Sequence, residues 1–273
     1  MVFSSIISTM RFRLLLALGS TLLITVALNV REYRYIPNES FGAGEVLTYR
    51  VHWGLLSAGE AVMRVSDTYF TVNDRPCYKI DVFGSTTGLA DVAIRVRDNW
   101  GAYVDTASIV PHKAYRYIQE GKYRKNEMVN FDHQNDQATV LHLDKKTRKL
   151  KKKEEFAVPN NVLDIVGGYY FLRTINYDNY KKGDIIKVSS FFDKEVYELE
   201  IRFLGRETIK TRVGDINAIV MAPSLPDNDF FSDGDPVKVW ISDDKNKVPL
   251  KVKAEIAVGA IEIDIKDMHN LRN

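Results

Sequence analysis

Apolar and polar residues alternate in short runs along most of this chain, a pattern that predicts β-strands with one buried and one solvated face. Residues 44–66 contain two such runs on either side of a glycine-bearing turn, which predicts a β-hairpin. The apolar face of its first strand comprises Leu47, Tyr49, Val51 and Trp53. We expect Tyr49 and Trp53 to lie on the inner wall of whatever sheet this hairpin begins.

Further strand-like runs follow as far as residue 266, separated by short turns. They cover residues 77–83, 93–104, 111–117, 126–131, 138–143, 197–203, 208–213, 216–221, 237–242, 250–256 and 261–265. Short connections between consecutive strands favour antiparallel pairing. The chain is therefore expected to be mainly β, with a large curved antiparallel sheet or half-barrel.

One helix is predicted, around residues 162–175, in a single β-rich domain that covers residues 44–266. Asn161 is expected to cap the helix, with Asp164 in its first turn, where a carboxylate suits the helix N-terminus. Gly167 and Gly168 inside the helix each cost roughly 1 kcal/mol against alanine, and close packing on a sheet would explain them. A division of the domain into two lobes near residues 158–183 is left open.

The first 27 residues have the pattern of a secretory signal. Arg11 and Arg13 precede an apolar run at residues 14–27, shorter than the roughly 20 residues of a membrane-spanning helix. We expect cleavage, with an uncleaved anchor as the alternative, and an irregular lead-in at residues 28–43. No cysteine follows the apolar run, so the protein is not expected to be a lipoprotein, and the mature chain is expected to have no transmembrane span.

Composition limits the kinds of partner. The chain is 45% hydrophobic and 27% charged, with a formal net charge of +2. Removal of Arg11 and Arg13 with the signal leaves a net charge of zero, so no general attraction for nucleic acid is expected. The lone cysteine, Cys77, has no partner for an internal disulfide and is interpreted as a buried thiol.

Motifs of catalysis and metal binding do not occur. There is no Gly-x-Ser-x-Gly elbow, the histidines are scattered without metal-ligand spacing, and no phosphate-binding glycine loop is present. The acidic loop at residues 227–235 departs from calcium-loop spacing, and the basic run at residues 145–153 is interpreted as a solvated hairpin loop, with contact to an anionic surface as the alternative. No cofactor, metal or catalytic residue is therefore assigned.

An ordered set of short motifs resembles a bacterial exported-protein family, domain-of-unknown-function family 3108. The motifs are Gly44-Glu45 with Leu47 and Tyr49, Trp53-Gly54, Ala58-Gly59-Glu60-Ala61, Val96-Arg97-Asp98, Asp164 with Tyr169-Tyr170-Phe171-Leu172-Arg173, Gly205-Arg206-Glu207 with Gly214, and Val239-Trp240-Ile241-Ser242-Asp243-Asp244 with Pro249. The resemblance implies a β-rich fold and a location in the periplasm or at the outer membrane of a Gram-negative bacterium. It supplies no activity.

A more distant likeness concerns the end of the chain. Trp240-Ile241, Pro249-Leu250 and Gly259 look like the last sheet of outer-membrane lipoprotein carriers, which curve an antiparallel sheet around a helix to hold acyl chains. This is an analogy at the level of fold.

Four residues are the candidates for contact with a ligand: Trp53, Trp100, Tyr170 and Arg173. Arg173 lies at the end of the predicted helix, where a salt bridge to Asp98, Glu60 or Asp164 is the structural alternative.

Three functions remain open from the sequence. The first is a non-enzymatic envelope protein that binds a lipophilic molecule or an envelope partner in the concavity of the sheet, and it predicts an apolar pocket of some hundreds of Å³. The second is an envelope hydrolase acting on glycan or ester, which would need ionisable residues among Asp98, His112, Asp164 and Asp243 to converge. The third is an assembly factor, which would display an exposed apolar patch.

Overall fold

The computed structural model describes residues 32–224, 235–256 and 259–273. The chain divides into two compact units, Met1–Tyr33 and Arg34–Asn273. The first is described only at its last two residues, so the architecture is that of the second. The predicted signal at residues 1–27, and the predicted acidic loop apart from Asp235, lie outside the described residues.

The second unit is built mainly from strands that form two meanders. The first meander contains β1 (Val46–Trp53), β2 (Leu56–Val72), β3 (Arg75–Thr86), β4 (Arg97–Asp105), β5 (Pro111–Glu120), β6 (Tyr123–Asp132), β7 (Gln137–Leu143) and β8 (Leu150–Ala157). The second contains β9 (Ile185–Phe192), β10 (Glu195–Thr211), β11 (Gly214–Pro223), β12 (Val237–Ser242), β13 (Pro249–Glu255) and β14 (Ala260–His269).

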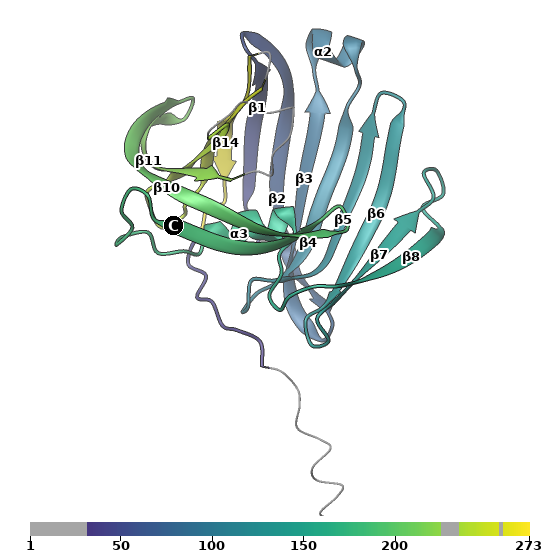
Figure 1. The fold of residues 1–273 in the computed structure, drawn as a ribbon. Helices are drawn as coiled ribbons and strands as arrows, with labels where there is room; N and C mark the ends of the chain where they lie inside the picture. Colours follow the sequence, from purple (N-terminus) through teal and green to yellow (C-terminus); the bar gives the residue numbers. More distant parts are fainter. Residues whose placement is uncertain (1–31, 225–234, 257–258) are drawn as a thin grey trace, which may run out of the picture. The chain divides into compact units, whose positions relative to one another are not determined.

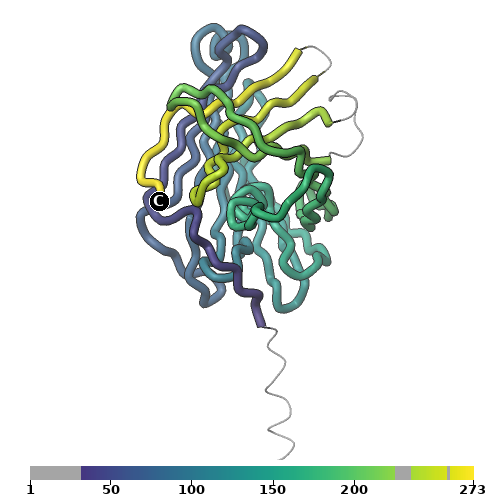
Figure 2. The backbone as a smooth tube through the Cα atoms, turned by 90° about the vertical axis from the view of Figure 1, so that its left-hand side faces the viewer, coloured from purple at the N-terminus to yellow at the C-terminus, as the bar shows by residue number. Residues whose placement is uncertain are grey.

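Both meanders belong to one antiparallel sheet of 14 strands (Figure 1). Its order is β8-β7-β6-β5-β4-β3-β2-β1-β14-β13-β12-β11-β10-β9, so the two meanders are joined where β1 pairs with β14. Figure 2 shows this junction as yellow strands beside purple ones. The predicted fold class, a large curved antiparallel sheet, is confirmed.

The two edges of the sheet approach each other without pairing. The segment between β8 and β9 starts at Val158, whose N–H donates to the Asp136 carbonyl at 2.9 Å. It then pairs with β9, where the Leu163 N–H donates to Ser189 O at 2.9 Å and the Phe191 N–H donates to Leu163 O at 2.8 Å. In Figure 1 the β9–β10 hairpin crosses in front of the first meander. The sheet is therefore curled into an open barrel.

The tip of the β9–β10 hairpin is tied to the first meander by ion pairs. Asp193 Oδ1 accepts from Arg116 Nη2 at 2.6 Å and from Lys125 Nζ at 2.7 Å. Next to it, Lys194 Nζ lies 2.9 Å from Glu154 Oε2. These contacts join the turn between β9 and β10 to β5, β6 and β8.

A helix, α3 (Ile165–Leu172), lies inside the curl and contacts β4 on one side and β9 on the other. The predicted helix is confirmed with tighter bounds, but its predicted cap is wrong. Asp164, not Asn161, is the N-cap, and its carboxylate accepts from the N–H groups of Val166 and Gly167, both at 3.0 Å. Asn161 has a left-handed φ of 58°, and Leu163 is engaged in the bridge to β9, so the helix begins later.

Two details differ from the prediction. Between the predicted strands at residues 77–83 and 93–104 the chain forms a short helix, α2 (Gly88–Ala93), and the second strand begins only at Arg97. The helix has no buried residue and therefore no amphipathic signal. The basic run at residues 145–153 is a loop only as far as Lys149, because Leu150 begins β8. Within β8, Lys152 pairs with Glu154 at 2.9 Å and Lys153 pairs with Glu155 at 2.6 Å. The strand therefore neutralises part of its own positive charge.

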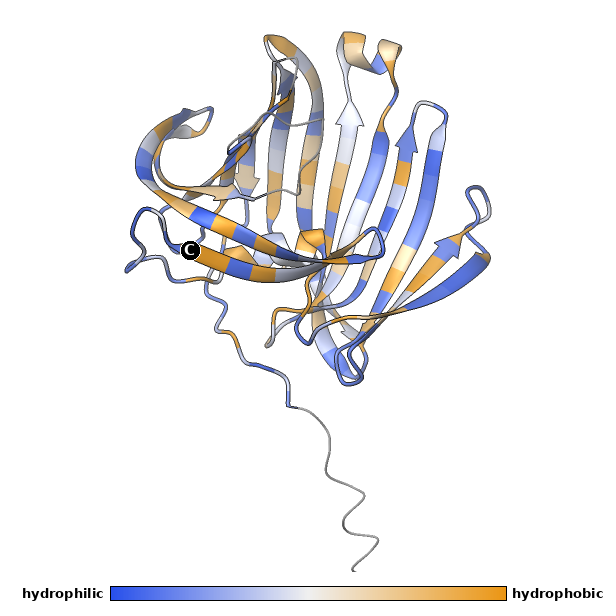
Figure 3. Ribbon diagram, in the orientation of Figure 1, coloured by the Kyte–Doolittle hydropathy of each residue, from blue (hydrophilic) through white to orange (hydrophobic). Residues whose placement is uncertain are grey.

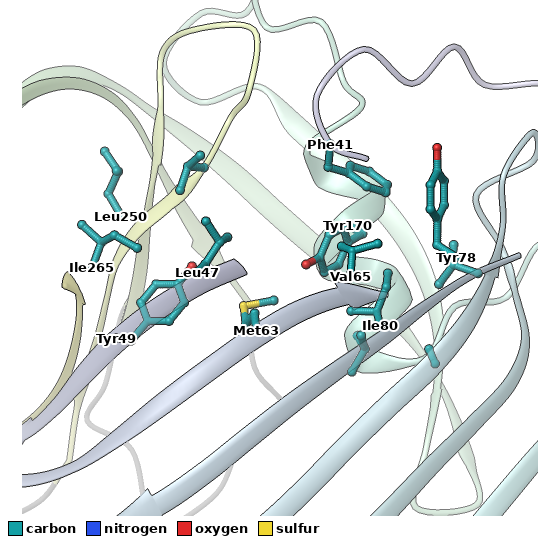
Figure 4. Close-up of a cluster of buried hydrophobic side chains, with 14 of the residues drawn as sticks. Phe41, Leu47, Tyr49, Met63, Val65, Tyr78, Ile80, Tyr170, Leu250 and Ile265 are labelled. Atoms are coloured by element: carbon teal, nitrogen blue, oxygen red, sulfur yellow. The ribbon is translucent and has the colours of Figure 1, made fainter. Parts of the chain in front are cut away.

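The main core lies between α3 and the inner face of the sheet near the β1–β14 junction (Figure 4). Tyr170 of α3 is fully buried, and Phe41 from the lead-in packs edge-on against it with ring centroids 4.7 Å apart. The strands contribute Leu47, Tyr49, Met63, Val65, Tyr78, Ile80, Leu250 and Ile265. This core holds α3 against the sheet and leaves space beside it.

Candidate functional site

An apolar cavity of about 420 Å³ adjoins this core, between the inner face of the sheet and the first half of α3. Strands β1 to β4 form one wall, β13 and β14 continue it, and α3 closes the other side. The lining residues are Tyr49, Ala61, Met63, Val82, Gly84, Asp98, Trp100, Ile165, Val166, Tyr169, Lys251, Val252 and Ile263. Most of these side chains are apolar.

The register of the strands explains why there is space here. Tyr49 pairs with Ala61, Ala61 with Gly84, and Gly84 with Asp98, so these four residues form one row across β1 to β4. The two middle members of the row carry a methyl group and a hydrogen atom. A Cβ built on Gly84 meets no heavy atom within 4 Å. The small residues therefore leave a hollow opposite α3 that larger ones would fill.

The second row of the wall is bulkier. Met63 pairs with Val82, and Val82 pairs with Trp100. The Trp100 ring stacks on Phe192 of β9, with centroids 6.0 Å apart. The Arg116 guanidinium lies 5.7 Å from the same ring. Trp100, a predicted ligand contact, thus lies in the cavity wall.

Helix α3 presents Ile165, Val166 and Tyr169 to the cavity. The buried Asp164 carboxylate fixes the start of the helix and so positions these three side chains. Burial raises the pKa of Asp164 to about 6, and the hydrogen bonds from the helix N–H groups lower it by less. Burial likewise raises the pKa of Tyr169, so its phenol is neutral at physiological pH.

The polar groups at the cavity already have partners within the protein. Asp98 Oδ1 accepts from the Gln119 N–H at 2.8 Å. Lys251 Nζ lies 2.7 Å from Glu262 Oε2, and the Tyr49 hydroxyl donates to Pro249 O at 3.0 Å. The wall therefore offers a ligand mainly apolar contact, with one acid and one base among its lining residues.

The other three predicted ligand contacts lie outside the cavity lining. Trp53 follows Tyr49 and Val51 on the same face of β1 and is 51% exposed at the end of the strand. Tyr170 and Arg173 are in the core. Tyr169, the neighbour of Tyr170, is the helix tyrosine that reaches the cavity.

Arg173 is buried in an ion pair with Glu45. Its Nη1 and Nη2 donate to the two Glu45 carboxylate oxygens at 2.5 Å and 2.7 Å. It also donates to the carbonyls of Asn246 and Ser40, the latter at 3.2 Å. Burial by itself would lower the pKa of Arg173, but the hydrogen bonds and charge of Glu45 outweigh it and raise that pKa.

The expected salt-bridge partners of Arg173 are wrong. Glu60 pairs with Lys266, Asp98 faces the cavity, and Asp164 caps α3. Glu45 precedes the first residue of β1, so the face pattern of that strand gave no signal for it.

The four residues considered for hydrolysis do not share a cavity. Asp98 lines the apolar cavity, Asp164 lines a pocket of about 40 Å³ beside Trp100, and Asp243 lines a polar cavity of about 640 Å³ near Tyr177. His112 is fully buried, and its Nε2 lies 3.2 Å from Asp105 Oδ2. Their positions therefore lend no support to a paired acid and base.

Two kinds of feature are absent from the described part of the chain. No group of three or more His, Cys, Asp or Glu side chains is placed to hold a metal ion there. Nor does that part contain a helix with the length and apolar character needed to cross a membrane.

The fold and the cavity together define a barrel-like antiparallel sheet curled around one helix. The chain belongs to the family described as protein of unknown function DUF3108, whose model matches residues 48–266. The resemblance inferred from the sequence motifs is thereby confirmed.

A solved structure shares the fold at low sequence identity. A beta-barrel-like protein of domain of unknown function DUF1849 from Brucella abortus is 8% identical, with a TM-score of 0.53, and the match covers 87% of this chain and 98% of that one. A candidate lipoprotein from Parabacteroides distasonis is 11% identical over 87% of this chain and 100% of its own, with a TM-score of only 0.34. Comparison with curated proteins gives no match.

Proposed function

We propose that this protein is an exported, non-enzymatic protein of the bacterial envelope that binds a lipophilic molecule in the cavity beside α3. The observation that carries the proposal is the apolar lining of a 420 Å³ cavity, walled by small residues in register on the sheet and by the helix. Ligand pockets in proteins typically measure about 300 to 1,000 Å³ and are mostly apolar with a few polar groups.

The energetics favour an acyl chain or a similar apolar body. Burial of a methylene group contributes about 0.8 kcal/mol, so ten of them contribute about 8 kcal/mol before the costs of association. Asp98 and Lys251 among the lining residues suit an amphiphile whose polar end stays near them. A polar ligand would gain less, because the buried hydroxyl of Tyr49 is already hydrogen-bonded to Pro249.

The export part of the proposal rests on the sequence. Arg11 and Arg13 before the apolar run at residues 14–27 form the pattern of a secretory signal. Separation of periplasm, membranes and cytoplasm from cells that express the full chain tests it, and recovery of the unprocessed chain in the cytoplasm would contradict it.

The binding test combines mass spectrometry of co-purifying lipids with titration of the fluorescent probe N-phenyl-1-naphthylamine. Gly84→Leu is the blocking variant, because Gly84 is a lining residue with open space beyond its Cβ position and no positive φ. Ser85→Leu is the matched control. It adds a similar side chain one position along β3, on the opposite face of the strand.

We expect the unaltered chain and Ser85→Leu to bind the probe and Gly84→Leu to bind it at least tenfold more weakly, with equal thermal stability across the three. Equal probe binding by all three would place the apolar site elsewhere. Absence of both co-purifying lipid and probe binding from the unaltered chain would overturn the proposed function.

A further inference from the structure

One end of the first meander forms a continuous surface, which we call the α2 end. It comprises the β1–β2 turn at residues 54–55, the α2 connection at residues 87–96, the β5–β6 turn at residues 121–122 and the β7–β8 turn at residues 144–149. Antiparallel strands bring these connections to the same end of the sheet. Backbone bonds join neighbours, since Thr87 N–H donates to Ala58 O at 3.1 Å and Gly121 N–H donates to Arg95 O at 2.8 Å.

Large apolar side chains are exposed at the α2 end. Leu55 is fully exposed at the tip of the β1–β2 turn, and Leu89 and Val92 of α2 are 77% and 85% exposed. Trp53 and Ile94 are each about half exposed beside them. Figure 3 shows apolar colour on α2 and on the β1–β2 turn, at the top of the view. These apolar side chains remain exposed to water in the folded chain, and a group of exposed apolar side chains marks an interaction surface.

Basic residues flank this apolar tip. The connections of the α2 end, taken with two strand residues on either side of each, carry nine bases: Arg95, Arg97, Lys122, Arg124, Lys145, Lys146, Arg148, Lys149 and Lys151. Against these nine, the same segments contain four acids, Asp91, Asp98, Glu120 and Asp144. The net charge of the α2 end is therefore about +5.

The opposite end of the same strands has the reverse charge. Its turns, at residues 73–74, 106–110 and 133–136, taken with two strand residues on either side of each, contain Asp74, Asp105, Asp132 and Asp136 against the single base Arg75. The first meander is thus polarised from a basic, apolar-tipped end to an acidic end. A chain with almost no net charge nevertheless has a preferred orientation in front of a charged surface.

We propose that the α2 end docks on a lipid bilayer that contains anionic lipids. Exposed Leu and Val side chains insert among the acyl chains, and the surrounding Lys and Arg side chains contact the headgroups, which is the division of roles expected at a membrane interface. A second copy of this chain fits less well, because two α2 ends would bring like charges together. A bilayer offers acyl chains to the apolar side chains and anionic headgroups to the basic ones.

Docking at this end would bring the cavity near the lipid phase. Gly84 and Asp98 line the cavity, and each lies within three residues of the strand end that joins α2. The inference goes beyond ligand binding and does not require it, since it concerns the outer surface of the turns rather than the cavity wall.

The test places the environment-sensitive fluorophore NBD at one end of the sheet or the other. Cysteine is introduced at Val92 of α2 or, as the matched control, at the exposed Thr71 near the opposite end of β2. Native Cys77 is fully buried, so it does not take the label. The full chain is used, with vesicles of phosphatidylethanolamine and phosphatidylglycerol at 7:3 or of phosphatidylcholine alone. The apolar run at residues 14–27 is present in every sample, so only the labelled position distinguishes them.

We expect the emission of NBD at position 92 to shift to the blue and at least double with the anionic vesicles, while NBD at position 71 stays unchanged. Equal responses at the two positions, or none at position 92, would overturn the proposal. A blue shift at position 92 without vesicles that grows with protein concentration would mean self-association instead, and would also overturn it.

A charge test separates headgroup contact from nonspecific adsorption. Lys145→Glu/Lys146→Glu reverses two exposed charges at the α2 end, and Lys181→Glu/Lys182→Glu reverses two exposed charges in the loop before β9. We expect the first pair to weaken partitioning into the 7:3 vesicles about tenfold or more and the second to weaken it much less. Equal weakening by both pairs would contradict docking through the α2 end.

Discussion

Glu45 and Arg173 form a bidentate ion pair with both side chains essentially inaccessible to solvent, and the two residues are 128 positions apart. The pair joins the start of β1 to the C-terminal end of α3. The guanidinium also lies over the rings of Phe41 and Tyr170, 5.2 Å and 5.1 Å from their centroids. The position of α3 against the sheet, and so one wall of the cavity, depends on this contact.

Loss of either partner should be costly. Glu45→Gln or Arg173→Met leaves an uncompensated buried charge or polar group, and we expect each to lower the free energy of unfolding by about 3 to 5 kcal/mol. The double variant should lose less than the sum of the two, which urea unfolding in a double-mutant cycle measures. Glu60→Gln, which breaks the half-exposed pair with Lys266, is the control and should cost under about 1 kcal/mol. Additive losses would show that the pair is not coupled.

The N-cap of α3 should make stability depend on pH. Burial raises the pKa of Asp164 to about 6, so between about pH 4 and pH 6 the folded chain keeps a proton that the unfolded chain has released. The stabilisation that this bound proton gives is therefore fully present below about pH 4 and is lost as the pH rises to about 6. Asp164→Asn keeps a capping oxygen without the charge, and we expect it to remove this part of the slope. An unchanged slope in urea unfolding at pH 4, 5 and 6 would refute the assignment.

Replacement of Asp164 by alanine separates charge from capping. Asp164→Ala also removes the titration, but it leaves the Val166 and Gly167 N–H groups without their acceptor. We expect it to be about 1 kcal/mol less stable than Asp164→Asn at pH 7.

Two glycines on neighbouring strands should respond in opposite ways to alanine. A Cβ on Gly59 would overlap with the Ser85 carbonyl oxygen, a backbone atom that cannot move without disturbing the β2–β3 pairing, whereas a Cβ on Gly84 enters open space. We expect Gly59→Ala to destabilise by about 1 to 3 kcal/mol and Gly84→Ala to be neutral or to stabilise by up to about 1 kcal/mol. Thermal unfolding of both variants provides the comparison, and equal effects would contradict the hollow beside Gly84.

The tip of the β9–β10 hairpin should loosen when Asp193 loses its charge. Hydrogen bonds from Lys125 and Arg116 lower the pKa of Asp193 to about 2. The stabilisation that the ionised Asp193 gives is therefore present above about pH 4 and is lost as the pH falls towards about 2. The carboxylate is 55% exposed, which limits the effect on overall stability to about 1 kcal/mol. Asp193→Asn should therefore act locally, with faster amide exchange at residues 191–196 and unchanged exchange in β1 and β2. Uniformly faster exchange would contradict a local fastening.

Cys77 should be unreactive in the folded chain. Burial and the nearby Asp105 charge raise the pKa of its thiol to about 12 from the ordinary 9.0, which lowers the thiolate fraction about a thousandfold at neutral pH. We expect 5,5′-dithiobis(2-nitrobenzoic acid) to label it fully in 6 M guanidinium chloride and hardly at all in buffer at pH 7.5. Rapid labelling in buffer would mean that β3 opens readily.

The class of fold could be read from the alternation of apolar and polar residues, because most strands have one face against the core or the cavity. Strand β8 has no buried residue and was not predicted. Tyr49 and Trp100 were recognised for the same reason, as apolar members of alternating runs. The cavity itself could not be located, because it depends on which residues of β1 to β4 stand side by side. Ala61 and Gly84 look unremarkable until the register puts them in one row.

The contacts that hold α3 also could not be predicted from the sequence pattern. Glu45 lies before the first strand and far from Arg173 in the chain, so neither spacing nor face assignment connects them. Helix α2 was missed because its apolar residues face solvent, and the periodicity argument assumes that apolar residues face a core. Both failures have the same origin, since local patterns report local neighbours.

The pairing of β1 with β14 has a consequence for the order of assembly. It joins residues more than 200 positions apart at the middle of the sheet. While the chain is being made, one hydrogen-bonding edge of β1 stays bare until the last strand emerges, although β1 to β8 could already have paired with one another. Contacts of such high sequence separation form slowly, and a bare edge invites pairing with other chains. A nascent chain that ends before residue 260 should therefore be prone to aggregate, and the complete sheet can form only once β14 has been made.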